Sequence, residues 1–300
     1  MDQFSHSSGG PNRALNPEEL REAIEQSADV DWEVADEPID LEQRLGYLPS
    51  RGVPPLEEQI ALGARAAAEA PPREPTYPPA VDLRATPAGN MITGVRDQGN
   101  CLSCVAFAAC ATVEGTLGVE RGQPVGTDLS EAYLFYCKAA AENRECGQGP
   151  RGGWYPKAAL DACKEGVPDE ACFPYTSWDQ PCTACADSAD RMTTIARWQA
   201  LHSPPQAKEW LAKRGPTIGS MAVFQDLAHY SGGVYSHITG AETGGHCVCV
   251  VGYDDNEGNW IVKNSWGTRW GEAGFFRIAY GQCGIDSGML GVEGVRPPNA

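Results

Sequence analysis

Two cysteines lie three residues apart in the stretch QGNCLSCVAFAACATVEG, just ahead of an apolar run. Such a C-x-x-C pair can be a redox dithiol, half of a metal site, one end of a disulfide, or a nucleophile with a neighbour. The apolar run predicts a helix over 104–119. A cysteine in the first turn of a helix is favoured as a nucleophile, because unpaired N–H groups and the helix dipole stabilise its thiolate. Cys104 has that position, whereas Cys101 precedes it in a Gly-Asn turn.

A nucleophilic cysteine also needs a base and a group that orients the base. Four of the five histidines fall in the Gly/Ser/Pro-rich start or in polar and Tyr/Gly-rich stretches. His246 differs, because in TGGHCVCVVGYDD it follows two glycines and is followed by a strand-like run. Asn264 stands at the end of another strand-like run, in IVKNSWGTRWG. Two adjacent strands could therefore hold an imidazole and an amide side by side.

Four residues in separate motifs, Gln98, Cys104, His246 and Asn264, resemble the papain-like cysteine peptidases. The local signature of that family is C-G-[SA]-C-[WY], with His and Asn about 130–150 residues downstream. Here the signature reads C-L-S-C-V, and the histidine follows the second cysteine by 142 residues. The segments DLSEAYLFYC, GGWYPKAAL and NSWGTRWGEAGFFRI also look like family motifs, the last being highly specific. GVYSHITGAETGGH is most similar to the cathepsin B branch, and the matches cover roughly 80–290.

The resemblance implies a catalytic role for each of these residues. Cys104 would attack the substrate carbonyl and form a thioester acyl-enzyme. His246 would pair with the thiolate as an imidazolium and then protonate the leaving amine. Asn264 would hold the imidazole ring, shielded from water by Trp266. Gln98 would donate its side-chain N–H to the developing oxyanion, a contact worth ~3–4 kcal/mol of barrier. The resemblance implies no cofactor and no metal.

Substrate-binding positions are implied in the same way. Leu102 stands where the family usually has glycine, so it should crowd the S1 side of the cleft, and Val105 replaces an aromatic residue. Gly288, five residues after Cys283, predicts a roomy S2 pocket without a fixed charge. The other expected positions are Gly152, Gly153, Trp154, Gly245 and Trp266.

Twelve cysteines are a density more usual where disulfides persist. The resemblance implies that Cys101 is structural. Zinc binding by cysteines within 163–185, which include CTAC, is an alternative to disulfides there. Without the nucleophile eleven cysteines remain, so at least one more must be free or pair between chains. The expected disulfides, two from the resemblance and the last as a local staple, are Cys101–Cys146, Cys137–Cys182 and Cys172–Cys185.

The elements that must position these residues divide the chain into two kinds of structure. Besides 104–119, helices are expected over 129–141 and 155–165. The last third instead contains short β-branched and aromatic runs separated by turns, which is typical of antiparallel strands. A helical half followed by a β half predicts an α+β fold with two lobes. The resemblance implies a papain-like fold, with a helical lobe against an antiparallel β-barrel lobe.

The first quarter of the chain has a different character. Residues 1–75 contain sixteen acidic and six basic residues, so they carry −10 of the total net charge of −17. Such a segment is by default a solvated or regulatory appendage. Residues 1–12 look disordered, a helix is expected to start near Asn16 with that residue as its cap, and a second helix is expected over 55–70.

The proline-rich segment 71–80, PPREPTYPPA, reads as a linker. We therefore expect an acidic extension, 1–75, followed by a peptidase domain, 76–300. The extension lacks the E-R-F-N-I-N pattern of many family pro-segments, but Leu45-Gly46-Tyr47-Leu48-Pro49 is apolar and extended enough to lie in the substrate cleft. These features suggest a precursor restrained by its own N-terminal segment.

Composition excludes other classes of partner. The acidic charge argues against nucleic-acid binding through phosphates, and no apolar run approaches the ~18 residues of a membrane span. The expected partners are a peptide or protein substrate and the chain's own N-terminal segment. No secretory signal is visible, which favours the cytoplasm, whereas the cysteine content favours an oxidising compartment, and the sequence leaves the two in conflict.

Two other functions fit parts of the pattern. A catalytically silent binding protein of papain-like fold is suggested by the altered neighbours Leu102 and Val105. A dithiol oxidoreductase would use Cys101 and Cys104 but would leave His246 and Asn264 without a role. Within the peptidase class, the paired histidines of the cathepsin B occluding loop have no counterpart between 137 and 153. Carboxy-dipeptidase activity is therefore not supported, and we expect an endopeptidase.

Overall fold

The computed structural model describes residues 15–27, 30–41, 44–46 and 76–298. The α-helices are α1 (Pro17–Glu25), α3 (Cys104–Arg121), α4 (Pro156–Glu165) and α5 (Pro204–Lys213). Shorter helical segments are η1 (Tyr133–Ala139), η2 (Ser188–Arg191), η3 (Gln225–His229) and η4 (Gln282–Gly284). The strands are β1 (Trp32–Val34), β2 (Ala80–Asp82), β3 (Thr194–Leu201), β4 (Thr217–Phe224), β5 (Tyr230–Tyr235), β6 (Glu242–Asp254), β7 (Asn259–Lys263), β8 (Phe275–Ala279) and β9 (Met289–Arg296).

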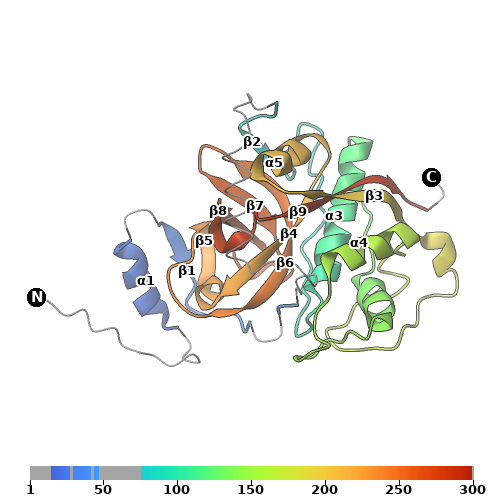
Figure 1. Cartoon of the computed structure of the whole chain (residues 1–300), viewed down its shortest axis with the longest axis horizontal. Helices are drawn as coiled ribbons and strands as arrows, with labels where there is room; N and C mark the ends of the chain where they lie inside the picture. Colours follow the sequence, from blue (N-terminus) through green and yellow to red (C-terminus); the bar gives the residue numbers. More distant parts are fainter. Residues whose placement is uncertain (1–14, 28–29, 42–43, 47–75, 299–300) are drawn as a thin grey trace, which may run out of the picture.

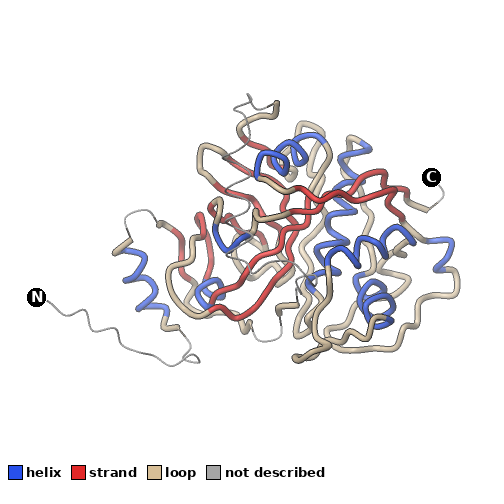
Figure 2. Tube along the Cα trace, viewed as in Figure 1, coloured by secondary structure: helices blue, strands red, loops and turns tan. Residues whose placement is uncertain are grey.

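The strands form one mixed, mainly antiparallel sheet in the order β1-β5-β8-β7-β6-β4-β9-β3, and β2 pairs with β6. Among the described strand pairs, β5 and β8 are parallel and the others are antiparallel. Figures 1 and 2 show the strands gathered beside α3 and α4. The predicted α+β class is therefore confirmed, with the β-rich lobe following the helical lobe in the chain.

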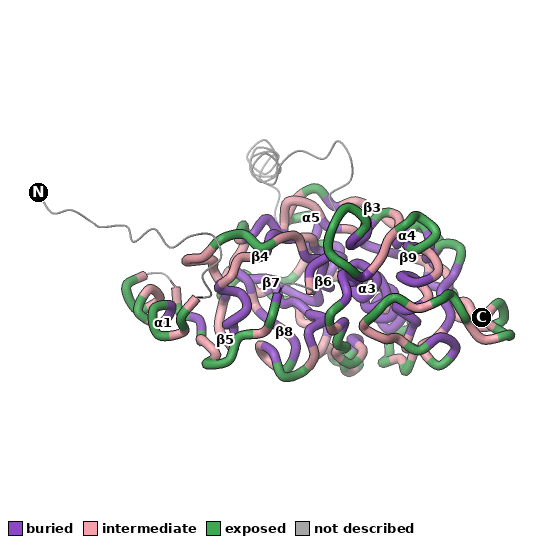
Figure 3. The backbone as a smooth tube through the Cα atoms, turned by 90° about the horizontal axis from the view of Figure 1, so that it is seen from below, coloured by how far each residue is buried: buried purple, intermediate pink, exposed green. Residues whose placement is uncertain are grey.

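Helix α3 runs between the two lobes and is buried from its first residue to Gly118. Its small residues allow this close packing. A Cβ added to Gly115 would lie 2.6 Å from Pro216, so the residue that precedes β4 packs directly against the helix. The helix ends at Gly122, whose φ of 63° is a left-handed conformation that glycine adopts without strain. Figure 3 shows that the buried residues follow this helix and the central strands.

Two apolar clusters stabilise the lobes. The cluster of the helical lobe contains Phe135, Trp154 and Leu160, and the cluster of the β lobe contains Trp260 and other buried aromatic residues. Burial of aromatic side chains of this size contributes a large share of folding free energy, because each removes ~150–250 Å² from water. Trp260 and Phe276 are fully buried, and Phe275 is partly buried beside them.

Most predicted elements are present. The helices predicted over 104–119 and 155–165 are α3 and α4, and the strands predicted in the last third are β6, β7 and β8. The helix predicted over 129–141 contains seven residues, Tyr133–Ala139, in the wider π-helical conformation. The helix predicted over 55–70 lies outside the described residues. The last residue of the proposed linker, Ala80, already belongs to β2.

The N-terminal segment is not simply a solvated appendage. Helix α1 begins as predicted, with the Asn16 side chain accepting the Glu18 N–H at 2.9 Å. Leu20 of this helix, and Trp32 and Leu41 beyond it, are buried in the cluster of the β lobe. Strand β1 adds to the edge of the sheet by pairing with β5. Of the two alternatives, a solvated or a regulatory appendage, the solvated one was wrong, because a few apolar residues spaced among the acidic ones are enough to dock the segment.

The structure contains the three expected disulfides, Cys101–Cys146, Cys137–Cys182 and Cys172–Cys185. The zinc alternative is therefore excluded for the cysteines that these bonds occupy, and Cys101 is not available as a partner thiol for Cys104. No helix in the described part of the chain is long and apolar enough to span a membrane. Six cysteines, all buried, remain free: Cys104, Cys110, Cys163, Cys247, Cys249 and Cys283.

Candidate active site

Cys104 is the first residue of α3, the position that the sequence predicts, and it is fully buried. Its sulfur lies within hydrogen-bonding reach of the backbone N–H groups of Cys247 and Gly46. Burial nevertheless dominates and raises the pKa of the thiol to about 12, although these N–H groups lower it. In this covered state the sulfur is therefore protonated.

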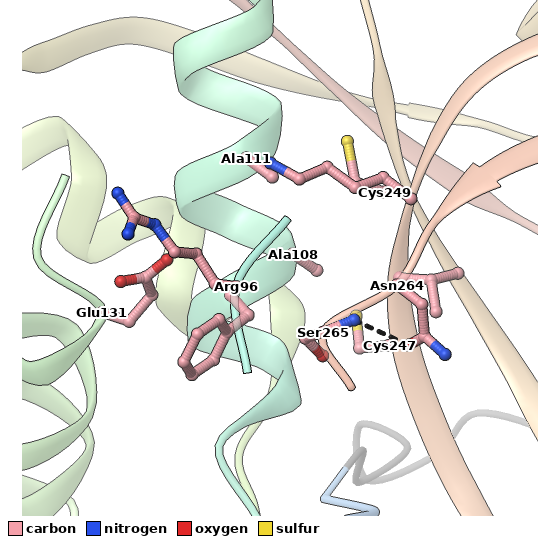
Figure 4. A pocket seen from close by; sticks show the side chains of 11 residues that line it. Arg96, Ala108, Ala111, Glu131, Cys247, Cys249, Asn264 and Ser265 are labelled. Atoms are coloured by element: carbon pink, nitrogen blue, oxygen red, sulfur yellow. Dashed lines mark hydrogen bonds between the residues drawn. The ribbon is translucent and has the colours of Figure 1, made fainter. Parts of the chain in front are cut away.

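His246 and Asn264 lie side by side, as their strands predict. His246 belongs to β6, Asn264 follows β7, and His246 Nε2 lies 2.8 Å from Asn264 Oδ1. The same oxygen accepts the Ser265 N–H at 2.8 Å (Figure 4), which fixes the orientation of the amide. Because an amide oxygen only accepts, Nε2 is the nitrogen that carries the proton.

The second nitrogen of this ring, His246 Nδ1, is buried and has no hydrogen-bond partner among the described residues. Burial lowers the pKa of His246 to about 4, although the contact with Asn264 raises it. The ring is therefore neutral above that pH. A neutral imidazole with one nitrogen anchored and the other unoccupied can accept a proton at Nδ1.

Trp266 covers the imidazole. Its ring stacks on that of His246 with centroids 4.6 Å apart, and it packs edge-on against Trp270 at 4.8 Å. This apolar cover shields the hydrogen bond between His246 and Asn264 from water. Trp266 therefore lies beside the base, and in this position it can restrict the orientation of the ring.

Gln98 is fully buried beside the Cys101 turn. Its Nε2 donates to the Cys101 carbonyl at 2.8 Å, and its Oε1 accepts the Ser265 hydroxyl at 2.6 Å. Both ends of the amide are therefore held, which leaves the second Nε2 hydrogen for another acceptor. Ser265 was not singled out from the sequence, although its place directly after Asn264 in the NSWG motif is a signal that could have found it.

Leu102 packs against the glycine-rich loop that contains Gly152 and Gly153. Its side chain is largely buried, and its Cδ1 would lie 2.6 Å from a Cβ added to Gly152. Gly153 follows with a φ of 73°, in the region that favours glycine. Trp154 is fully buried, and its Nε1 donates to Glu142 at 3.1 Å. The loop is therefore held rigidly against the leucine.

Residues 44–46, which we call the cleft segment, lie over this site. The Gly46 N–H donates to the Gly245 carbonyl at 3.2 Å, and the Gly46 carbonyl accepts the Trp154 N–H at 2.8 Å. A Cβ on Gly46 would lie only 2.0 Å from the Leu102 carbonyl oxygen. The cleft segment therefore bridges the β lobe and the helical lobe, and it fits only because residue 46 is glycine.

Arg44 and Leu45, the other two residues of the cleft segment, anchor it near His246. The Arg44 guanidinium bonds Asp97 Oδ1 at 2.8 Å, and the Arg44 carbonyl accepts the Trp266 Nε1–H at 3.3 Å. Leu45 is buried in the cluster of the β lobe, close to Gly244. Of the stretch expected in the cleft, Tyr47, Leu48 and Pro49 lie outside the described residues.

The structure brings most of the predicted residues together around the cleft segment. Gly288 is the exception, because none of the contacts described above involves it. No atom lies within 4 Å of a Cβ added there, so the backbone at this position faces open space. The residues that surround the cleft segment or its immediate neighbours are Gln98, Leu102, Cys104, Gly152, Gly153, Trp154, Gly245, His246, Asn264 and Trp266.

This arrangement combines a thiol at a helix N-terminus, an anchored imidazole, and a buried amide donor. Such a set can perform nucleophilic acyl transfer, in which the thiol attacks a carbonyl and the imidazole moves the proton. It needs no redox partner, and Cys101 is bonded to Cys146. The dithiol alternative therefore loses its second thiol.

The chain is similar in sequence to known cysteine proteases. Residues 77–292 match the family described as papain family cysteine protease. The chain is 34% identical over 213 residues to cathepsin B-like CP3 of Giardia intestinalis, covering 67% of this chain and 69% of that protein. It is also 34% identical over 209 residues to cathepsin B-like CP2 of the same organism, covering 65% and 67% of the two chains.

Solved structures of proenzymes match most of the chain, including its N-terminal part. Procathepsin B S9 of Trypanosoma congolense has a TM-score of 0.70 at 23% identity and covers 92% of this chain and 94% of its own, which shows a shared fold. Procathepsin L 3 of Tenebrio molitor has a TM-score of 0.61 at 26% identity, covering 92% and 79%. The Carica candamarcensis protease CMS1MS2 has a TM-score of 0.60 at 29% identity, covering 73% and 100%. The N-terminal region thus resembles the corresponding region of procathepsins.

Proposed function

We propose a specific mechanism for this chain, which belongs to the papain family of cysteine proteases. Cys104 attacks the carbonyl carbon of a peptide bond, forming a thioester acyl-enzyme, and water then hydrolyses the thioester. The observation that carries this proposal is the anchored imidazole, with His246 Nε2 held by Asn264 Oδ1 at 2.8 Å and Nδ1 unoccupied. An imidazole held in this way has one nitrogen available for the reaction.

His246 moves the protons in this mechanism. It takes the Cys104 proton at Nδ1 and gives it to the amine that leaves, and in the second half it takes a proton from the attacking water. Asn264 keeps Nδ1 directed toward the reaction by accepting from Nε2, and Trp266 covers this hydrogen bond. The ring therefore cycles between neutral and protonated forms without changing its orientation.

The negative charge that develops on the carbonyl oxygen needs donors in place. Gln98 supplies its remaining Nε2 hydrogen, beside the backbone N–H of Cys104 at the start of α3. Because Ser265 and the Cys101 carbonyl already fix the amide, little reorganisation is needed when the charge appears. Such preorganised donors are typically worth about 3–4 kcal/mol each.

The N-terminal segment, which we assign to residues 1–75, keeps the enzyme silent in the full chain. Gly46 contacts both lobes and the Cys104 sulfur, so a substrate cannot occupy the same place. Burial under the cleft segment also favours the neutral thiol and the neutral imidazole, because it raises one pKa and lowers the other. Removal of the segment admits water and restores the conditions for a charged pair. The peptidase domain then corresponds to residues 76–300.

The proposed activity is that of an endopeptidase on peptides or proteins. Residues 137–153 contain no histidine that could bind a substrate's terminal carboxylate in the way paired histidines can. Leu102 and the loop of Gly152, Gly153 and Trp154 line one wall, while Gly245 offers its carbonyl from the other. Gly288 is assigned to an open S2 pocket. Hydrolysis of internally quenched peptides without release of C-terminal dipeptides would support this specificity.

The test compares wild type with Cys104→Ala on fluorogenic dipeptide substrates, after acid incubation of both full-length chains. We expect hydrolysis by wild type alone, together with alkylation of Cys104 by a peptidyl epoxide. Equal hydrolysis by both proteins would disprove the mechanism. Absence of both hydrolysis and enhanced labelling would instead identify a silent binding protein of the same fold.

A further inference from the structure

The Cys247 thiol has no role in the proposed mechanism, yet it lies beside the reacting groups. It directly follows His246 in β6, and its side chain is 1% exposed. The Cys247 N–H lies within hydrogen-bonding reach of the Cys104 sulfur, and Cys104 is one of the groups whose charge acts on the Cys247 thiol. Both sulfurs are free in the structure.

The packing of β6 on α3 independently places Cys247 beside the first turns of α3. Thr112 Oγ1 of α3 contacts the Cys249 sulfur of β6 at 3.5 Å. From Cys249, the two residues back to Cys247 cover about 6.6 Å of strand. From Thr112, the four residues back to Ala108 cover about 6 Å of helix. Cys247 is therefore opposite Ala108, one helical turn from Cys104. Figure 4 shows Cys247 and Ala108 on facing walls of the same small cavity.

The backbone of Cys247 also lies close to the Cys104 sulfur. The Cys247 amide nitrogen is one bond, about 1.5 Å, from its Cα. Because this N–H acts on the Cys104 sulfur as a hydrogen-bond donor, the Cys247 backbone lies near that sulfur. The Cys247 sulfur now lies 4.0 Å from Ser220 Oγ, and rotation about χ1 is the movement available to it.

We propose that Cys247 is a resolving thiol, which forms a reversible disulfide with Cys104 when a peroxide oxidises the nucleophile. The inference rests on the proposed role of Cys104 as the reactive thiolate. It adds an oxidative modification site to the active centre. The modification switches the protease off and also protects its nucleophile from irreversible oxidation.

The chemistry is balanced in two steps. First, the Cys104 thiolate attacks one oxygen of hydrogen peroxide, so that an S–O bond forms, the O–O bond breaks and hydroxide leaves as water after gaining a proton. Second, the Cys247 sulfur attacks the Cys104 sulfur, so that the S–S bond forms and the S–O bond breaks. A second water leaves, carrying the Cys247 proton. Two thiols are oxidised, one peroxide is reduced, and His246 Nδ1 is placed to transfer these protons.

The experiment treats the acid-activated protein, in which Cys104 is uncovered, with hydrogen peroxide, blocks the remaining thiols, and maps Cys104 by mass spectrometry without reduction. The wild type should yield a linked peptide joining Cys104 to Cys247 that dithiothreitol removes. Cys247→Ala should lose this peptide and accumulate about tenfold more Cys104 as dimedone-trapped sulfenic acid or as sulfinic acid. Cys249→Ala is the matched control, because it removes a buried thiol of the same strand that contacts Thr112, and it should behave as wild type.

Each outcome decides the proposal. A linked peptide in wild type and Cys249→Ala, absent from Cys247→Ala, supports it. The absence of a linked peptide in wild type overturns the proposal, whether Cys104 is recovered as thiol or as sulfinic acid. Equal loss of the linked peptide in Cys247→Ala and in the Cys249→Ala control also overturns it. Failure of the proposed function is recognised separately, because Cys104 would then be alkylated by a peptidyl epoxide no faster than the buried thiols of Cys110 and Cys163.

Discussion

At the scale of single residues, the orientation of the base depends on one amide. Asn264 Oδ1 accepts from both His246 Nε2 and the Ser265 N–H, while the Ser265 hydroxyl holds Gln98. His246 and Gln98, the proposed base and oxyanion donor, are therefore both held by two consecutive residues after β7. A change at either position should disturb catalysis with little effect on folding, since both side chains act at the edge of the strand.

Replacement of Asn264 by alanine tests this positioning role. We expect kcat to fall about 10²-fold, because a misoriented imidazole loses part of the 10²–10⁴ that a positioned acid–base group contributes. Asn264→Gln keeps an amide and should recover part of the loss. The measurement is steady-state hydrolysis by acid-activated protein, with the pH profile recorded for each variant. An unchanged kcat for Asn264→Ala would show that the hydrogen bond is not needed.

Leu102 is the residue that should limit the substrate side chain at the cleaved bond. Its side chain packs on Gly152 and fills space that glycine would leave open. We expect Leu102→Gly to raise kcat/KM about tenfold for a substrate with a large P1 residue, within the ~1–3 kcal/mol that pocket size can contribute. The matched control is the same peptide with glycine at P1, which should change little. An equal effect on both peptides would contradict a role in specificity.

At the scale of elements, the cleft segment joins two lobes that otherwise meet along α3 and β6. It contributes one backbone hydrogen bond to each lobe, through the N–H and the carbonyl of Gly46. Strand β1 and helix α1 hold the preceding part of the chain against the β lobe. The proposed inhibition therefore depends on docking of a whole segment, and Gly46 is the point at which this segment most closely approaches the helical lobe.

A side chain at position 46 should release this inhibition in the intact chain. Gly46→Val cannot be accommodated, because its Cβ would lie 2.0 Å from the Leu102 carbonyl oxygen. We expect at least about tenfold faster peptide hydrolysis, equivalent to ~1.4 kcal/mol of weakened docking. Gly94→Val is the control, since nothing lies within 4 Å of a Cβ there. If Gly46→Val hydrolysed substrate no faster than wild type, the cleft segment would not be the inhibitor.

At the scale of the whole molecule, buried acid groups link stability to pH. The pKa of Glu170 is raised to about 7, mainly by burial and also by Asp128 and Glu114, against the lowering effects of the Tyr175 N–H and Arg96. Burial likewise raises the pKa of Glu131 well above its usual range. A raised carboxyl pKa means that the folded state keeps a proton that the unfolded state has lost. These groups stabilise the fold at low pH, and their contribution is lost as pH rises.

Glu170→Gln isolates one of these contributions. Between pH 4.5 and 7 the unfolding free energy of the parent should fall relative to that of the variant, because the native carboxyl retains its proton over this range. Allowing for partial solvent screening, we expect a difference of about 1–2 kcal/mol. Urea unfolding at both pH values, in a Cys104→Ala background that prevents self-cleavage, measures it. An identical pH dependence in parent and variant would contradict the assignment.

The features that could be predicted from the sequence are those that depend on a short stretch of residues. The start of α3 at Cys104, the cap at Asn16 and the strands before Asn264 were predictable, since capping, apolar periodicity and short motifs act over a few residues. The π-helical turn of η1 was not predictable, because it depends on the packing of its side chains in the helical lobe. Ser265 was also missed, because its partner Gln98 is distant in the sequence.

The sequence by itself determined the candidate chemistry-bearing residues and the α+β class, since these are recorded in residue types and spacings. The expected disulfide pairs needed more than spacing, because two of them came from the resemblance to a known family. Only the tertiary structure decided that the acidic N-terminal segment is docked, that Gly46 bonds both lobes, and that the Cys247 N–H acts on the Cys104 sulfur. These facts depend on contacts between segments far apart in the chain. Such contacts arise when buried surfaces pack, and no local pattern specifies them.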